Sequence, residues 1–167
     1  MSQIKLIAIS GSLRKGSYNS NAVRFLQKEL PENVSLELLD ISQVPLLNED
    51  DEKKPLPESV LNLKDKIAEA DGVIFATPEY NYSIPPALKN AIDWASRGKN
   101  LWSDKPVAIF SASLGMLGGS RVQGHLRQVA LCLNMRALNK PEVFIGSAHT
   151  KFDKEGNLTD ATTQDFL

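Results

Sequence analysis

The stretch Gly11-Ser12-Leu13-Arg14-Lys15-Gly16-Ser17-Tyr18-Asn19 decides how this chain is organised. It follows an apolar run at residues 4–9 and precedes a helical pattern of apolar residues at 22–30. A strand, a glycine- and hydroxyl-rich turn and a helix are the usual layout of a phosphate site, because free N–H groups and the helix dipole converge there. The turn has the spacing of neither a Walker A loop nor a dinucleotide fingerprint, so it predicts a site for one terminal phosphate. An ordinary polar loop that caps the helix is the alternative interpretation.

Composition sets the broad class. The 167 residues are 42% hydrophobic and 23% charged, with a net charge of −1, which fits one globular domain over residues 1–167. This charge argues against a nucleic-acid partner and against a strongly acidic electron carrier. The first residues lead directly into a strand pattern, so we expect no signal peptide, and we expect no membrane span because no apolar run is long enough. The single cysteine, Cys132, excludes an internal disulfide and fits the cytoplasm. We expect its side chain to be packed with the apolar residues of its helix rather than to have a redox role.

Strand and helix patterns alternate along the chain, which predicts an α/β fold: a doubly wound, five-stranded parallel sheet with helices on both faces. The common strand order for this arrangement is 2-1-3-4-5. The expected strands are Ile4–Ile9, Val34–Leu39, Gly72–Ala76, Val107–Ser111 and Glu142–Ile145, and the expected helices are Asn19–Leu30, Pro57–Ala70, Pro86–Ser96 and Ser120–Leu133. A hairpin-like turn at 153–157 and a short helix from Asp160 are expected to follow.

Three unusual loops follow the first, third and fourth strands, which are neighbours in this strand order. The first loop, residues 10–19, contains the stretch quoted above, and we call it the phosphate turn. The second, residues 77–86, combines two tyrosines with three prolines and predicts a stiff wall for a flat heteroaromatic ligand. The third, residues 111–120, is glycine-rich and lets backbone approach a ring. A phosphate, a flat ring and an anion-stabilising edge together indicate flavin mononucleotide (FMN), and the missing dinucleotide fingerprint disfavours FAD.

The chain resembles the NADPH-dependent FMN reductase family, which includes quinone, chromate and azo-dye reductases. The resemblance rests on the phosphate turn, on Thr77-Pro78-Glu79-Tyr80-Asn81-Tyr82-Ser83-Ile84-Pro85 and on Leu88-Lys89-Asn90-Ala91-Ile92-Asp93-Trp94, and it extends from about Ile4 to about Phe144. It implies a flavodoxin-like fold, bound FMN, NADPH or NADH as co-substrate, and a homodimer or homotetramer with flavins near the subunit interface.

The resemblance also implies which residues bind FMN. The residues for the phosphate and ribityl region are Ser12, Leu13, Arg14, Ser17, Tyr18 and Asn19; those for the isoalloxazine are Pro78, Glu79, Tyr80 and Asn81; those for its other edge are Ser113, Gly115 and Gly118. Leu47 stands where many relatives carry a tyrosine, which removes any aromatic stacking from that loop. The chain also ends early relative to the family pattern, which shortens the expected closing helix.

These observations predict an FMN-dependent NAD(P)H oxidoreductase that passes hydride from nicotinamide to flavin and then reduces a quinone-like acceptor in a ping-pong cycle. The cofactor carries the chemistry, so no side chain is expected to be a catalytic acid, base or nucleophile, and Glu79 is expected to anchor its loop. His125 and His149 lack partners at metal-ligand spacing, so no metal site is expected. A flavodoxin-type electron carrier and a non-flavin regulatory domain on the same fold are the alternatives.

The apolar residues of the third helix suggest a subunit contact. Leu88, Ala91, Ile92, Trp94 and Ala95 offer more apolar surface than one sheet face needs. We therefore expect part of this surface to meet a second subunit across a two-fold axis.

Overall fold

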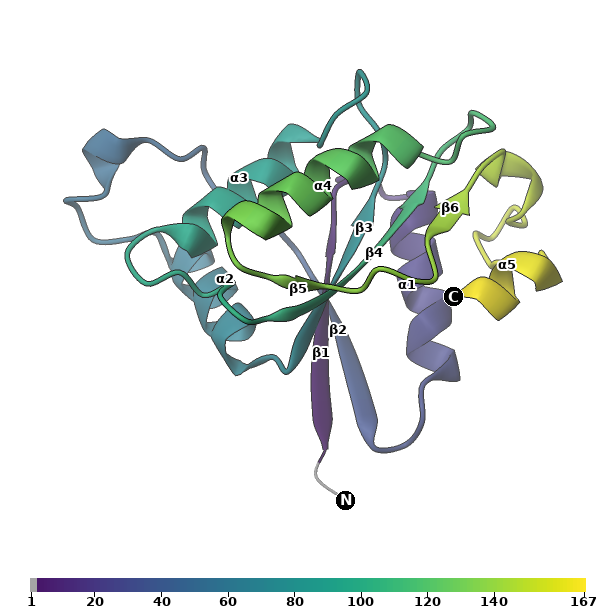
Figure 1. Cartoon of the computed structure of the whole chain (residues 1–167), viewed down its shortest axis with the longest axis horizontal. Coiled ribbons are helices and arrows are strands. Elements are labelled where there is room, and N and C mark those ends of the chain that lie inside the picture. Colours follow the sequence, from purple (N-terminus) through teal and green to yellow (C-terminus); the bar gives the residue numbers. More distant parts are fainter. Residues whose placement is uncertain (1–2) are drawn as a thin grey trace.

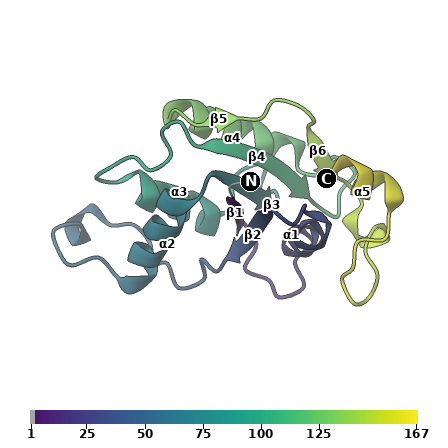
Figure 2. The same ribbon diagram turned by 90° about the horizontal axis from the view of Figure 1, so that it is seen from below.

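The computed structural model describes residues 3–167 as a parallel sheet covered by helices on both faces (Figures 1 and 2). The strands are β1 (Ile4–Ser10), β2 (Val34–Leu39), β3 (Gly72–Thr77), β4 (Pro106–Ala112), β5 (Arg136–Ala137) and β6 (Val143–Ile145). The α-helices are α1 (Tyr18–Glu29), α2 (Glu58–Glu69), α3 (Pro86–Ser96), α4 (Ser120–Cys132) and α5 (Ala161–Phe166), and short 3₁₀ turns occur at η1 (Glu49–Asp51) and η2 (Ala148–Thr150). The helices and the hairpin-like turn, closed by a bridge between Phe152 and Leu158, lie where the sequence predicts them.

Two cores form because successive residues of a strand point to opposite faces of the sheet. Ile7 and Ile9 of β1 pack with α2, α3 and α4 on one face, whereas Ala8 packs with α1 and the C-terminal segment on the other. Figure 1 shows the same layers, with α3 and α4 on the opposite side of the sheet from α1 and α5. Burial on both faces explains why β1, β3 and β4 are apolar runs rather than alternating patterns.

The sheet has the predicted order, β2-β1-β3-β4-β5, and all its pairings are parallel. The prediction of five strands is wrong in one respect, because two short strands share the last position. β5 pairs with the start of β4 at Pro106 and Val107, and β6 pairs with its end from Phe110 to Ala112. Pro141, which has no N–H group to donate, lies in the interruption between the two strands.

Two predictions about helix surfaces are wrong. The five apolar residues of this prediction, Leu88, Ala91, Ile92, Trp94 and Ala95, are each at most 2% exposed within one chain, so they are not available to a second subunit. Trp94, for example, donates its indole N–H to the carbonyl oxygen of Pro45, 2.7 Å away. Cys132 is exposed rather than packed. Val122, Leu126 and Ala130 form the buried stripe of α4, and at 100° per residue position 132 falls on another side of the helix.

The irregular segment between β2 and α2 is tied to α3. The Asn90 amide accepts the N–H of Leu47 at 2.8 Å and donates to the Pro45 carbonyl at 2.8 Å. The Arg97 guanidinium forms an ion pair with Glu52. Within residues 3–167, no helix is long and apolar enough to cross a membrane.

Candidate functional site

The three loops predicted to meet do meet, in one groove at the carboxyl ends of β1, β3 and β4. We call it the first groove; its volume is about 490 Å³. It is lined by Ser12, Arg14, Ser17, Tyr18, Asn19, Pro78, Glu79, Tyr80, Ala112, Ser113 and Leu114. Ala112 and Leu114 are lining residues that the sequence analysis missed, although their position beside Ser113 could have indicated them. Leu13, Asn81, Gly115 and Gly118, four of the predicted residues, lie outside this lining.

The phosphate turn presents hydrogen-bond donors to the first groove. Ser17 is the N-cap of α1, and its hydroxyl accepts the N–H of Ser20 at 3.3 Å. The first N–H groups of a helix have no partner inside it, which leaves those of Tyr18 and Asn19 for a ligand. The Arg14 guanidinium also lines the groove, with its carbon 5.6 Å from the centre of the Tyr18 ring. This set of neutral and charged donors suits a phosphate.

Gly11 brings the phosphate turn against the loop that follows β3. Its N–H donates to the Ala76 carbonyl at 2.9 Å. A Cβ atom at this position would lie 2.7 Å from Oγ1 of Thr77, closer than real contacts allow. A glycine is therefore needed here for the two loops to share one groove.

Asn19 connects the start of α1 to the end of β4. Its side-chain nitrogen donates to the Ala112 carbonyl at 3.1 Å, and its side-chain oxygen accepts the Ala112 N–H at 2.9 Å. Asn19 is 3% exposed, so this pair is shielded from water. The side-chain amide therefore positions the wall of the groove, and the Asn19 backbone N–H is the group best placed for a ligand.

The loop after β3 is a tight hairpin turn. Tyr80 and Ser83 exchange two backbone hydrogen bonds of 3.1 and 2.9 Å, and Asn81 and Tyr82 between them have φ angles of 48° and 67°. Left-handed conformations at both central positions define a type I′ turn, which is costly for a tyrosine. The Arg121 guanidinium stacks on the Tyr82 ring at 4.0 Å and offsets part of this cost.

Glu79 fixes the same loop to α4. One carboxylate oxygen accepts the N–H groups of Arg121 and Val122 at 2.9 and 3.0 Å. The N-cap residue of α4 is Gly119, which supplies no side-chain cap, so Glu79 provides the negative charge that stabilises this helix start. Glu79 thus has the anchoring role expected from the sequence, and both contacts hold its carboxylate toward the helix.

A buried hydrogen-bond network around Ser111 holds the glycine-rich loop after β4. The Ser111 hydroxyl donates to the Gly118 carbonyl at 2.6 Å and accepts the side-chain N–H of Gln123 at 2.8 Å. Gly118 has a φ of 59°, and a Cβ atom there would lie 2.8 Å from the backbone nitrogen of Gly146. Gly118 is therefore buried against the end of β6, where it shapes the loop from outside the groove.

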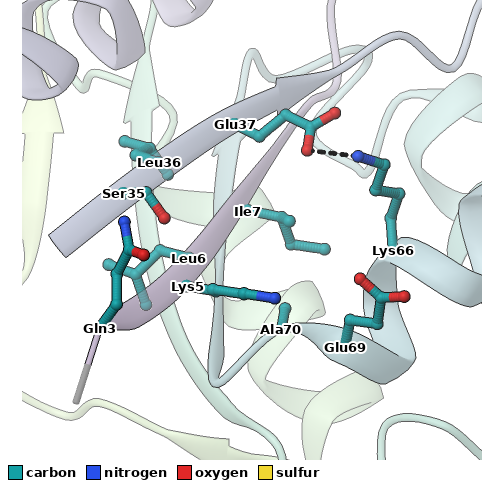
Figure 3. Close-up of a pocket in the computed structure, with 10 residues that line it drawn as sticks. All are labelled: Gln3, Lys5, Leu6, Ile7, Ser35, Leu36, Glu37, Lys66, Glu69 and Ala70. Carbon is teal, nitrogen blue, oxygen red and sulfur yellow. Dashed lines mark hydrogen bonds and ion pairs between the residues drawn. The ribbon is translucent and has the colours of Figure 1, made fainter.

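A separate pocket of about 330 Å³ lies near the opposite end of the strands, between β1, β2 and α2 (Figure 3). An ion pair between Lys66 and Glu37, 2.7 Å long, crosses one side of it. None of the predicted cofactor-binding residues lines this pocket. The sequence motifs therefore converge on the first groove.

A groove at the point where the strand order reverses, between β1 and β3, defines a flavodoxin-like nucleotide-binding protein. Residues 4–150 match the family described as NADPH-dependent FMN reductase, and the chain belongs to that family.

Similar proteins agree with this assignment. The chain is 48% identical to an NAD(P)H-dependent FMN reductase of Pseudomonas aeruginosa, with 98% of this chain and 89% of that protein covered. It is 45% identical to an NADPH:quinone oxidoreductase of Arabidopsis thaliana, with 98% and 86% covered. The solved structure of a flavoenzyme NAD(P)H:(acceptor) oxidoreductase from Paracoccus denitrificans is 38% identical and has a TM-score of 0.88, with 98% and 90% covered.

The predicted fold class, family and function are therefore confirmed: the chain is an FMN-dependent NAD(P)H oxidoreductase with a flavodoxin-like fold. These relatives carry the names of enzymes, which favours an enzyme over an electron carrier.

Arg14→Ala is expected to weaken FMN binding about 10- to 150-fold, because one charged hydrogen bond contributes about 1.5–3 kcal/mol. Titration of the flavin-free protein with FMN measures this change. Arg136→Ala is the matched control, since Arg136 pairs with Asp104 on the exposed surface at β5. Equal FMN affinity in wild type and Arg14→Ala would remove Arg14 from the site.

Proposed function

We propose that FMN binds in the first groove, with its phosphate on the turn 12–19 and its isoalloxazine between Pro78–Tyr80 and Ala112–Leu114. Three features of the groove support this fit. Hydrogen-bond donors gather around Ser17 and Arg14. Other parts of the groove are lined by Pro78, by the Tyr80 ring and by the short side chains of Ala112 and Ser113. The volume of the groove is about 490 Å³. Helix starts with free N–H groups favour a phosphate, and stiff apolar walls favour a flat ring.

The protein contributes position rather than proton transfer. FMN, when bound, accepts hydride from the nicotinamide of NAD(P)H and passes two electrons to an acceptor. Glu79 is held by two backbone N–H groups of α4, and Asn19 by the backbone of Ala112, so both polar side chains serve the walls of the groove. Such fixed walls hold a ring in one orientation without movement during the reaction.

We propose a quinone-like acceptor. The name of the Arabidopsis relative gives a quinone as its substrate. On this chain, Tyr80 and Tyr82 are 48% and 64% exposed at the rim of the loop after β3, where a flat, partly apolar molecule can pack. The acceptor and the nicotinamide would then use the same exposed face of the flavin, one after the other.

Sequential use of one flavin face predicts ping-pong kinetics. Initial rates measured against NADPH at several fixed quinone concentrations are expected to give parallel double-reciprocal lines. Intersecting lines would show that both substrates bind together and would contradict a shared face.

We further propose that the enzyme is a cytoplasmic homodimer or homotetramer in which a second subunit encloses the groove. Exposed apolar residues gather on the loops around it: Leu13, Leu114, Met116 and Leu117 are 55%, 64%, 87% and 55% exposed. Apolar side chains grouped beside a ligand groove are typical of a surface that another molecule covers. The single cysteine supports a reducing compartment.

Sedimentation velocity at assay concentration tests the assembly. We expect a dimer or tetramer, and we expect Met116→Glu to shift it toward monomer because the substitution places a charge in the contact. Leu131→Glu on the far end of α4, where Leu131 is 82% exposed, is the control. A fully active wild-type monomer would contradict the proposal.

A further inference from the structure

A second groove lies on the other side of the phosphate turn. Its volume is about 430 Å³, and it runs between the turn, the start of α1 and the end of β2. Ser12 and Arg14 line both this second groove and the first one. A single extended ligand could therefore pass over the turn from one groove to the other.

Positive charge is concentrated in the second groove, although the chain as a whole carries a net charge of −1. Arg14 and Lys15 come from the turn, and Arg24 comes from the second turn of α1. Arg24 donates one hydrogen bond to Asn21, 2.7 Å away, and a guanidinium has further N–H groups for a ligand. Lys15 and Arg24 do not line the first groove, so the FMN phosphate does not account for them.

The remaining lining adds hydroxyl groups, one carboxylate and the apolar residues Leu13, Leu38, Leu39 and Ile41. The Ser20 hydroxyl donates to the Ser10 hydroxyl at 3.0 Å, and both serines are buried. Asp40, just after β2, accepts the N–H of Ser42 at 2.8 Å. Hydrogen bonds from the Ser42 backbone and hydroxyl hold the pKa of the Asp40 carboxyl below its usual value, so it is ionised at neutral pH and can accept a sugar hydroxyl.

Cationic side chains in one part of a groove can bind a phosphate, and a carboxylate in another part can accept a hydrogen bond from a sugar hydroxyl, so the groove suits a phosphorylated ribose. Resting on the function proposed above, we propose that the second groove binds the 2′-phosphate-bearing adenosine end of NADPH while the nicotinamide end lies at the flavin. The 2′-phosphate is the only chemical difference between NADPH and NADH, so Lys15 and Arg24 would set the preference for NADPH.

Calorimetry on the FMN-saturated protein tests this groove without turnover, with adenosine 2′,5′-bisphosphate and AMP as probes. Wild type is expected to bind the bisphosphate at least tenfold more tightly than AMP, since each charged hydrogen bond contributes about 1.5–3 kcal/mol. The double variant Lys15→Gln/Arg24→Gln is expected to lose that difference. Lys28→Gln, on an exposed part of α1 outside both grooves, is the control.

Steady-state rates supply the second readout. The ratio of kcat/KM for NADPH to that for NADH is expected to fall about 10- to 100-fold in the double variant and to stay at the wild-type value in Lys28→Gln. Unchanged bisphosphate affinity, or an equal loss with both co-substrates, would overturn the proposal. If wild type transferred no electrons from either co-substrate, the proposed function would fail, and the calorimetry would still decide what the second groove binds.

Discussion

The buried pair between the Asn19 side chain and the backbone of Ala112 is the interaction on which the site depends most. It joins segments 93 residues apart, the start of α1 and the end of β4, by two hydrogen bonds of 3.1 and 2.9 Å. These segments form two walls of the first groove. Because the pair is shielded from water, leaving its groups unsatisfied would be costly, and the spacing of the walls is fixed accordingly. Glu79 acts similarly for the third wall, since it ties the loop after β3 to α4.

This rigidity fits the chemistry of an enzyme whose cofactor does the reaction. Hydride transfer between nicotinamide and flavin needs alignment, and alignment comes from walls that do not move. Two further features stiffen the same edge of the sheet. Tyr82 has a left-handed backbone conformation, and the Arg121 guanidinium stacks on its ring. The Ser111 hydroxyl donates a hydrogen bond to the Gly118 carbonyl. The exposed rim residues around that edge form the surface on which we propose that a second subunit packs.

The strand order and the meeting of the three loops could be predicted because both follow from the pattern of apolar residues and from the topology of a parallel sheet. Apolar runs identify strands buried on two faces, and parallel strands bring their carboxyl ends to one edge. Contacts at the level of single side chains could not be predicted in this way. Whether the Asn19 amide points to a ligand or to Ala112, and whether Gly118 faces the groove or β6, depends on packing between distant segments. The break in the last strand and the inward packing of α3 likewise depend on neighbours that no local pattern contains.

Identification of the flavin carried by the purified protein tests the central claim most directly. The protein is denatured, and the released flavin is separated by chromatography and quantified against the protein concentration. A groove with one set of phosphate donors and no dinucleotide fingerprint predicts FMN, up to one molecule per chain. FAD as the main species, or a protein that neither carries nor takes up FMN, would contradict the account.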